Sequence, residues 1–447
     1  MGTDPFRSER DSMGEVHVPS HALYGAQTQR ATENFVVGRH RFQSSFIKVL
    51  GLVKACAARA NADLGVLPRE LAGAIEKSAD AIARGEHYEQ FVVNVFQTGS
   101  GTSTNMNANE VIAHLAHAHP NDHVNRSQSS NDGIPTVIHI AAAVEVQSQL
   151  LPALELLSAA LENRAAAFWD VMKIGRTHLQ DATPMRLGQE FSGYAQQIRA
   201  CAERITLTLD GIYELPLGGT AIGTGVNAPP GFAERAIALI AERTGFPFRE
   251  ARNHFEAQAA KDAVSFLSGA LKTCAVALTK IANDIRWLGS GPRGGLGEIR
   301  LPELQPGSSI MPGKVNPVIP ESLLMICSQV IGHDATITWG CAAGNFELNV
   351  MMPVIAYDLL DSIELLSAGV RNFTLRCVNG IEADREKTAA LVEQSLAMAT
   401  ALTTEIGYDR AAAIAKEAHE TGRTVREVAI EKSGLSTETI SELLRFD

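Results

Sequence analysis

The stretch VSFLSGALKTCAVALTKIANDIRWL, residues 264–288, decides the fold. Its apolar residues recur at alternating steps of three and four, the heptad pattern of one long helix with a single apolar seam. The seam consists of Val264, Leu267, Leu271, Cys274, Leu278, Ile281, Ile285 and Leu288. The breaker Gly289-Ser290-Gly291-Pro292 follows directly. Because so long a seam needs a partner surface, we predict a bundle of long helices and an oligomer.

Further helical patterns lie on both sides of this seam. Apolar periodicity predicts helices over about 45–64, 70–83, 138–169 and 354–373, and another after residue 320. Helices of twenty or more residues span over ~30 Å, and no strand–helix alternation indicates a parallel sheet. We therefore predict a mainly all-α fold, an elongated long-helix bundle with two smaller domains. The predicted parts are an N-terminal, mostly helical domain (1–130), the central bundle (131–384) and a small C-terminal helical domain (385–447).

Composition narrows the classes of function. The chain has 447 residues, with 39 basic and 50 acidic side chains and a net charge of −11. That balance argues against nucleic acid and anionic membrane as partners. The cysteines form no CxxC pair, and we find no apolar run long enough to span a bilayer. The first sixteen residues lack an apolar h-region. We therefore expect a cytoplasmic protein with reduced thiols.

Four polar islands interrupt the apolar patterns. The first, QTGSGTSTNMN (97–107), offers glycines for close backbone approach and hydroxyls and amides for carboxylate oxygens, or is simply a flexible loop. The second combines HPND (119–122) with SQSSND (127–132). The histidines nearby, at 114, 117, 119 and 123, come without a carboxylate or cysteine set, so we expect no metal.

The third island, GRTHLQDATP (175–184), contains His178, a natural group for proton transfer near neutral pH, although an isolated loop histidine is usually structural. The fourth, PGSSIMPGKVNPVIP (306–320), has mobile glycines, and Lys314 supplies a local positive charge. It is not a P-loop, because no hydroxyl residue follows the lysine. GGTAIGTG (218–225) lacks a preceding strand, and we interpret it as close packing at a bend.

These islands together resemble the aspartase/fumarase superfamily, whose signature GSSIMPGKVNP stands at 307–317. The resemblance runs over nearly the whole chain, from SERDSMGEV to IGYDRAAAIAKEAH. Aspartases typically carry alanine, glutamine and threonine where Gly313, His178 and Ser130 stand here. QTGSGT and GRTHLQDATP also match the class II, metal-independent fumarases, whereas VNPVIPE and the NGI at 379–381 are aspartase-like.

The resemblance implies a lyase of the tricarboxylic acid cycle that hydrates fumarate reversibly to (S)-malate through an aci-carboxylate, without metal or organic cofactor. Ser308 would be the base, and His178, paired with Glu321, would act on the acid side. Substrate would be held by Ser100, Gly101, Thr102, Asn105, Ser129, Ser130, Asn131, Thr177, Ser309, Lys314, Val315 and Asn316. A second dicarboxylate site would comprise His119, Pro120, Asn121 and Asp122.

The family also implies a homotetramer whose active sites combine residues from three subunits, which would explain why the islands are scattered. One departure concerns the second site: the stretch before His119 is short and lacks an arginine that relatives often carry upstream. Two alternatives remain beside the fumarase hypothesis. One is an ammonia lyase acting on aspartate, and the other is a catalytically retired structural protein, like the lens crystallins of this superfamily.

Overall fold

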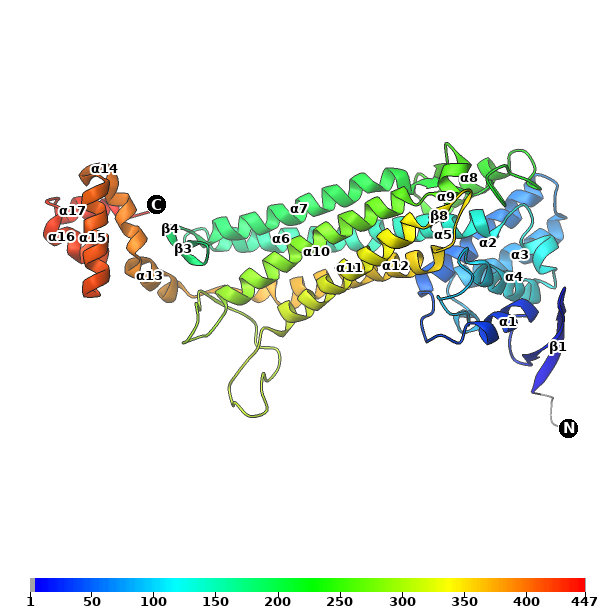
Figure 1. The fold of residues 1–447 in the computed structure, drawn as a ribbon, viewed down its shortest axis with the longest axis horizontal. Coiled ribbons are helices and arrows are strands. Elements are labelled where there is room, and N and C mark those ends of the chain that lie inside the picture. The colour runs from blue at the N-terminus through cyan, green and yellow to red at the C-terminus, as the bar shows by residue number, and fades with distance from the viewer. Residues whose placement is uncertain (1–4, 447) are drawn as a thin grey trace. The chain divides into compact units, whose positions relative to one another are not determined.

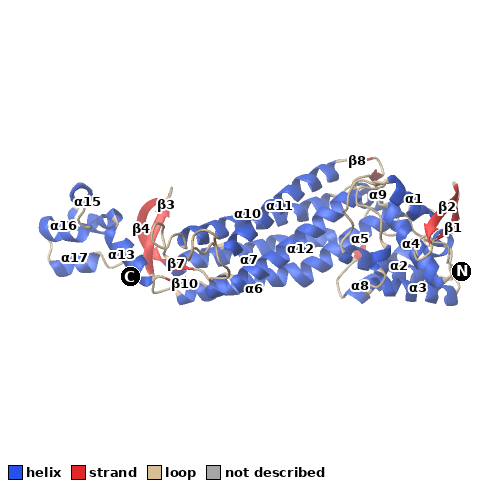
Figure 2. Ribbon diagram, turned by 90° about the horizontal axis from the view of Figure 1, so that it is seen from below, coloured by secondary structure: helices blue, strands red, loops and turns tan. Residues whose placement is uncertain are grey.

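The structure, a computed structural model, describes residues 5–446. Helices dominate it, and every sheet among these residues has only two strands (Figures 1 and 2). The predicted all-α character is therefore confirmed. The chain divides into two compact units, each built from separate stretches. Unit 1 comprises Met1–Pro152, Ala202–Ala275 and Ile326–Ser367, and unit 2 comprises Ala153–Cys201, Val276–Met325 and Ala368–Asp447. The three-part division at 130 and 384 stays a prediction.

Unit 1 is built mostly from helices of moderate length (Figure 1). Its helices are α1 (Ala26–Asn34), α2 (Ser44–Asp63), α3 (Arg69–Ala83), η1 (Tyr88–Gln90), α4 (Thr102–Ala116), η2 (Pro120–Val124), α5 (Ser130–Glu145), η3 (Val146–Leu150), α8 (Phe232–Thr244) and α9 (His254–Ala259). Its strands are β1 (Phe6–Asp11), β2 (Gly14–Pro19), β5 (Glu214–Leu215), β6 (Arg249–Glu250), β8 (Gly344–Asn345) and β9 (Leu348–Asn349). The ranges predicted for α2 and α3, 45–64 and 70–83, lie within one residue of these bounds.

The packing of α2 against α3 shows why the sequence folds this way locally. A Cβ on Gly51 would lie 2.7 Å from the backbone nitrogen of Ala83, so only glycine allows the two helices to approach so closely. Phe46, Ile75 and Ile82 are fully buried along this contact. Burial of that kind contributes roughly 1.5–3 kcal/mol for each large apolar side chain.

Two predicted islands are partly helical, which corrects the reading of them as interruptions. Residues 102–107 form the first turns of α4, and residues 130–132 form the first turn of α5. The helix expected from about 138 therefore begins earlier, at Ser130, and continues through η3 into α6 (Leu151–Ala167). Apolar periodicity could not locate this start, because the first turn carries polar side chains.

Unit 2 contains the hairpin of β3 (Met172–Thr177) and β4 (Gln180–Arg186), which sequence analysis did not predict. Its C-terminal helices bury a core of their own, which includes Leu402, Ile414, Val428 and Ile440. The remaining elements are β7 (Ile299–Arg300), η4 (Val378–Gly380), β10 (Glu382–Ala383), α13 (Arg385–Gln394), η5 (Leu396–Leu402), α14 (Thr403–Ile406), α15 (Tyr408–Thr421), α16 (Val425–Lys432) and α17 (Thr437–Leu443).

Besides α6, four long helices contribute residues to both units: α7 (Leu187–Ile212), α10 (Asp262–Leu288), α11 (Val318–Ala342) and α12 (Met352–Arg376). The breaker at 289–292 ends α10 as predicted. Every residue of the heptad seam is at most 4% exposed. The seam is therefore satisfied inside one chain, and our argument from it to an oligomer was wrong. The side chains that stay exposed on α10 lie outside the seam, among them Phe266 and Val276.

Two helical stretches, Ser130–Ala167 and Asp262–Leu288, are long and apolar enough to cross a bilayer by length and composition alone. This corrects the expectation that no apolar run reaches that length. Of the most apolar window in each stretch, 61% and 50% respectively is buried inside the protein. A helix that is apolar on most sides is found in the core of a large protein as well as in a membrane.

Candidate active site

The loop from Pro306 to Pro320 is pinned at its base and open at its tip. The Gly307 backbone nitrogen donates to Lys314 O at 2.7 Å, and Asn316 Nδ2 donates to Gly307 O at 2.8 Å. A Cβ on Gly307 would lie 2.5 Å from Lys314 O, so this closure requires glycine. The loop is thus a closed turn that presents its intervening residues to solvent.

Ser308 lies half-buried inside this closure. Its Oγ accepts hydrogen bonds from the backbone nitrogens of Ile310 at 3.3 Å and Met311 at 3.2 Å. Two amide dipoles aimed at one oxygen stabilise negative charge on it. These amides belong to the loop's own turn and not to the following helix, because α11 begins only at Val318.

The other charged and polar side chains of the 306–320 loop are at least partly exposed to solvent. Ser309, Lys314 and Val315 are exposed, and Asn316 is half-buried. Among residues 5–446, Lys314 has no ion-pair partner, so its charge is available to a ligand. Glu321 lies half-buried in the first turn of α11, where the helix dipole favours an acid.

His178 stands at the tip of the β3–β4 hairpin rather than in an irregular loop. Thr177 pairs with Gln180, so His178 and Leu179 form a two-residue turn with left-handed φ angles of 57° and 60°. Such turns favour Asn-Gly, and residues with a Cβ held in this region cost of order 1–3 kcal/mol each. The His178 side chain is exposed, and the described part of the chain offers it no hydrogen-bond partner.

A buried ionic cluster lies at the base of this hairpin. Arg176 donates from Nη1 to Glu298 Oε2 at 2.9 Å and from Nη2 to Glu298 Oε1 at 3.0 Å. Lys173 Nζ lies 3.1 Å from Glu190 Oε2 and 3.7 Å from Glu298 Oε2. Burial opposes the charge on Arg176, but the Glu298 carboxylate outweighs it and raises the pKa of Arg176. Sequence analysis missed Glu298, which lies 122 residues from Arg176 along the chain.

In unit 1, three predicted substrate-binding hydroxyls come together from two separate islands. Ser100 Oγ lies 2.8 Å from Thr102 Oγ1, which lies 2.7 Å from Ser130 Oγ. Ser100 and Ser130 are buried, and Gly101 between the first two has a left-handed φ of 75°. These hydroxyls now bond one another, and they can rotate to donate to an anion.

Asp132 organises the second island and was not singled out from the sequence. Its Oδ1 accepts from the Ser129 backbone nitrogen, while its Oδ2 accepts from the backbone nitrogens of Gly218 and Thr220, all at 2.8–2.9 Å. Burial raises the pKa of Asp132, although these three donors oppose the rise. Asn131 Nδ2 donates to Ala221 O at 2.8 Å. The available signal was the capping-box pattern from Ser129 to Asp132.

The 218–225 run therefore supports the predicted donors, through the hydrogen bonds of Gly218 and Thr220 to Asp132. A Cβ on Gly218 would lie 2.5 Å from the Ala233 side chain, and one on Gly223 would lie 2.8 Å from Phe255. The expected close packing at a bend is confirmed. A two-residue strand, β5, does precede the run, against the sequence expectation.

Lys54 lies behind these donors and is 1% exposed. Its Nζ donates to Asn125 Oδ1 and to Gln128 Oε1, each at 3.0 Å. Burial lowers the pKa of Lys54 to about 7, and Asp132 acts against that shift. Asn105 Nδ2 also donates to Asn125 Oδ1 at 3.2 Å, while the buried Asn105 Oδ1 has no hydrogen-bond partner among residues 5–446. Nothing in the apolar pattern of α2 marked this lysine.

The residues of the predicted second dicarboxylate site form an exposed turn at the start of η2. His119 Nδ1 accepts from the Asp122 backbone nitrogen at 3.0 Å and lies 3.2 Å from Asp122 Oδ2. Pro120 and Asn121 occupy the first positions of η2. Within the described residues, no group of three or more His, Cys, Asp or Glu side chains is arranged to hold a metal ion.

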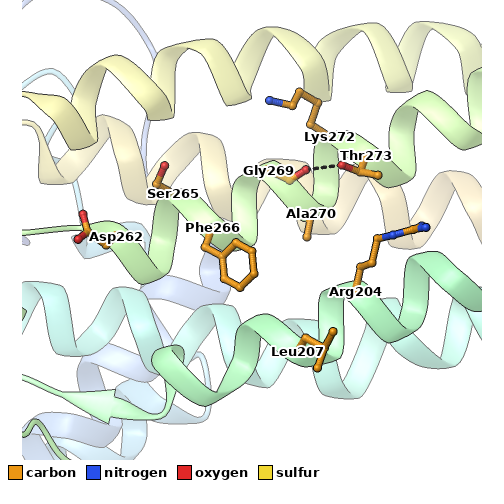
Figure 3. A pocket seen from close by; sticks show the side chains of 9 residues that line it. All are labelled: Arg204, Leu207, Asp262, Ser265, Phe266, Gly269, Ala270, Lys272 and Thr273. Carbon is orange, nitrogen blue, oxygen red and sulfur yellow. Dashed lines mark hydrogen bonds between the residues drawn. The ribbon is translucent and has the colours of Figure 1, made fainter.

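A surface cavity of about 660 Å³ is lined by none of the predicted site residues. It lies along α7 and α10 within unit 1 (Figure 3). Figure 3 shows the ring of Phe266 and the side chain of Leu207 facing the same space, with Arg204 farther along α7 and Lys272 pointing away on the other side of α10. Phe266 and Leu207 are 62% and 72% exposed. This is an open apolar surface and not an enclosed catalytic pocket.

Comparison with known proteins agrees with this geometry. A family model described as "Lyase" matches residues 14–332, and one described as "Fumarase C C-terminus" matches residues 398–447. A protein named fumarate hydratase class II, from Thermosynechococcus vestitus, is 51% identical over 100% of this chain and 98% of its own length. Fumarate hydratase 1, mitochondrial, from Arabidopsis thaliana is 50% identical over 98% of this chain and 92% of its own.

A solved structure shows the same fold. The class II fumarase from Schistosoma mansoni superposes with a TM-score of 0.95 at 40% identity, covering 98% of both chains. The mainly helical bundle of the fumarase/aspartase type, predicted from the seam and the islands, is thereby confirmed.

Proposed function

We propose, because the chain belongs to the class II fumarate hydratases of the lyase family, that it catalyses the reversible hydration of fumarate to (S)-malate. The single observation that carries this proposal is full-length similarity at about half identity to proteins that bear this name. Gly313, Ser130 and His178, where aspartases differ, favour water over ammonia as the leaving group.

In the direction from malate, Ser308 removes the C3 proton, and the electron pair moves into the neighbouring carboxylate as an aci-carboxylate. The hydroxyl then leaves from the opposite face, as anti elimination requires. A serine is a poor base in water, so its ionised form needs help. The amides of Ile310 and Met311, which donate to Ser308 Oγ, support this role because they stabilise an anionic oxygen.

His178 acts on the acid side and protonates the departing hydroxyl through a bound water. Its exposed position leaves both ring nitrogens free for water or for a partner side chain. Glu321 is proposed as that partner, because a carboxylate beside an imidazole fixes its orientation and favours its charged form. No hydrogen bond joins His178 to Glu321 within the described chain, and the proposed pairing is one between subunits of the assembled enzyme.

The remaining residues must stabilise the doubled negative charge of the aci-carboxylate intermediate. Preorganised donors stabilise such charge most when water is excluded. Lys314 contributes a full positive charge, and the linked hydroxyls of Ser100, Thr102 and Ser130 contribute neutral donors. The other members of the proposed substrate set are Gly101, Asn105, Ser129, Asn131, Thr177, Ser309, Val315 and Asn316. Closure of the glycine-bounded loop at 306–320 would exclude water.

The active enzyme is proposed to be a homotetramer with sites shared between subunits. Exposed apolar side chains on the long helices support it: Leu207, Phe266, Met325 and Trp339 are each more than 60% exposed. Exposed apolar patches of this kind mark contact surfaces. The distribution of the proposed residues over separate segments of the chain is also what a shared site requires.

We further propose a cytoplasmic enzyme without metal or organic cofactor, and a second dicarboxylate site at 119–122. The net charge of −11 supports a location away from nucleic acid and anionic membrane. One relative, from Arabidopsis thaliana, is named mitochondrial. The second site rests on the match of His119, Pro120, Asn121 and Asp122 to the family pattern.

The proposal is tested by incubating the purified enzyme with EDTA and (S)-malate and following the absorbance of the new double bond. Fumarate should form, and no fumarate would refute the hydratase. The same preparation is given L-aspartate, and ammonia release is measured. Ammonia formed faster than fumarate would favour the ammonia lyase, whereas no product from either substrate would favour the retired structural protein.

A further inference from the structure

The β3–β4 hairpin holds its proposed catalytic histidine in an unfavourable backbone conformation. His178 and Leu179 both carry a Cβ, and both adopt left-handed φ angles in the two-residue turn. A turn of this kind forms readily with glycine but not with these residues. It persists only where the surrounding structure fixes the flanking strands. The residues that fix these strands therefore control where the imidazole lies.

The fixing contacts converge two residues before His178. Arg176 reaches Glu298 with both terminal nitrogens, and this planar, bidentate arrangement restrains direction as well as distance. Glu298 is fully buried, so water does not compete for its oxygens. Lys173, on the same strand as Arg176, places its Nζ 3.7 Å from Glu298 Oε2 and gives the carboxylate a second cation.

The hairpin is irregular next to this contact. The register of β3 against β4 shifts between Ile174 and Arg176, so that Gly175 alone faces two residues of β4, Ala182 and Thr183. A Cβ on Gly175 would lie 2.8 Å from Thr183 O, so the close approach of the two strands at this point requires glycine. A bulge bends the strand that carries it and increases the local twist. The irregular pairing lies directly before Arg176.

Glu298 is itself fixed from both sides of its backbone. Its nitrogen donates to Leu288 O, the last residue of α10, at 2.8 Å. Its carbonyl accepts from the Asp384 nitrogen at 2.9 Å. The carboxylate that grips the hairpin therefore belongs to a segment anchored to a long helix, eight residues before the loop that begins at Pro306.

We propose that Arg176 and Glu298 are positioning residues for the reaction, which hold the strained turn so that His178 presents its imidazole to the leaving hydroxyl. The proposal rests on the hydratase function proposed above. A positioning residue acts only through the residue that it positions. The competing explanation is that the ion pair merely stabilises unit 2.

A double-mutant cycle separates the two explanations. Arg176→Lys keeps the charge but removes the bidentate grip, and His178→Asn removes the positioned group. We expect Arg176→Lys to lower kcat about 10- to 100-fold, because small misplacements of a reacting group have effects of this size. KM for malate should change much less than kcat, because Thr177 is the one proposed substrate-binding residue on this hairpin. In the His178→Asn background, Arg176→Lys should change kcat by less than about twofold.

Arg385→Lys is the matched control. Arg385 also forms a bidentate pair, with Asp170 at 2.8 and 3.0 Å, in the same unit, but both side chains are exposed. Its replacement should leave kcat unchanged. If Arg176→Lys lowers kcat by the same factor with and without His178, or no more than Arg385→Lys does, the positioning role is refuted.

Hydrogen exchange gives a readout that does not depend on activity. In the wild type, the amides of β3 and β4 should be protected, and Arg176→Lys should speed their exchange about tenfold without affecting α15. Glu298→Gln should reproduce the effect if Arg176→Lys does not fold. Unprotected hairpin amides in the wild type would overturn the proposal even if no variant folds. A wild type with protected hairpin amides but no fumarate formation would refute the hydratase function instead.

Discussion

Lys54 makes the stability of this protein depend on pH in a predictable direction. An ammonium has an ordinary pKa of 10.5, and burial lowers that of Lys54 to about 7. Between these values the unfolded chain binds a proton that the folded chain releases. The folded state is therefore penalised most below pH 7, and the penalty fades as the pH rises toward 10.5. Stability should rise with pH across this interval.

The magnitude follows from the same two values. Each pKa unit corresponds to about 1.4 kcal/mol, so the full penalty is about 5 kcal/mol. Of this, about 3 kcal/mol is recovered between pH 7 and pH 10. In Lys54→Met this recovery should be missing. Replacing the amine removes the donor to Gln128 Oε1, whereas Asn125 Oδ1 keeps the amides of Asn105 and Asn109 as donors. That loss is a constant offset and does not change with pH.

The assay is urea unfolding followed by circular dichroism at several pH values, at one protomer concentration because an oligomer gains stability by mass action. The free-energy difference between wild type and Lys54→Met should grow by about 3 kcal/mol in favour of the wild type from pH 7 to pH 10. Lys77→Met, at an exposed position on α3, should show no such trend. If wild type and Lys54→Met respond to pH in parallel, Lys54 is charged in the folded protein and the reasoning fails.

Four further substitutions probe the site and the assembly. Ser308→Ala should lower turnover by about 10²–10⁴-fold with the mass in solution unchanged, and near-wild-type turnover would remove it as the base. His178→Asn should lower kcat by a similar factor, and an unaltered rate would contradict the acid role. Asp132→Asn should raise KM for malate and lower stability by about 1–3 kcal/mol, so an unchanged KM would separate Asp132 from the substrate donors. Phe266→Asp should reduce the mass seen by light scattering while each chain stays folded, and an intact tetramer would exclude that surface.

The long helices were predictable because their apolar spacing repeats many times. The seam in α10, the breaker at 289–292 and the bounds of α2 and α3 all followed from that repetition. The hairpin of β3 and β4 was not predictable in the same way, because its strands are six and seven residues long and a bulge interrupts their alternation. Its turn also lacks the Asn-Gly or Asp-Gly pair that marks such hairpins.

The seam of α10 also shows that an apolar repeat does not reveal which surface buries it. Periodicity identifies a face that must be buried, but the same spacing serves a contact within a chain and a contact between chains. We assigned the seam of α10 to a partner, whereas residues such as Leu278 are buried by their own chain. The exposed apolar residues of that helix, such as Phe266, follow no comparable repeat, so the sequence did not separate them.

The motifs of the candidate site were predictable from the sequence. The residues that support the site through contacts, such as Glu298 and Lys54, were not. The polar islands marked Ser308, His178 and Ser130 because polar residues are unusual within apolar patterns. Glu298 and Lys54 act through contacts to residues 122 and more than 70 positions away, respectively. Single-sequence reasoning has no signal for pairs at that separation. A buried charged residue looks like any surface charge until its partner is known.

The supports nevertheless share one arrangement, which bears on why the site is built from separate segments. Ser308 is carried on a loop closed by Gly307 and Asn316, and His178 on a hairpin gripped by Glu298. His178 thus stands on an accessible tip with a fixed base, and Ser308 lies half-buried beside the fixed closure of its loop. If the site is completed by another subunit, as proposed above, fixed segments of this kind are needed, because a mobile segment would lose entropy on every assembly. The fixed base places each side chain in advance, and the exposed position of His178 leaves its imidazole free to meet residues of a neighbouring chain.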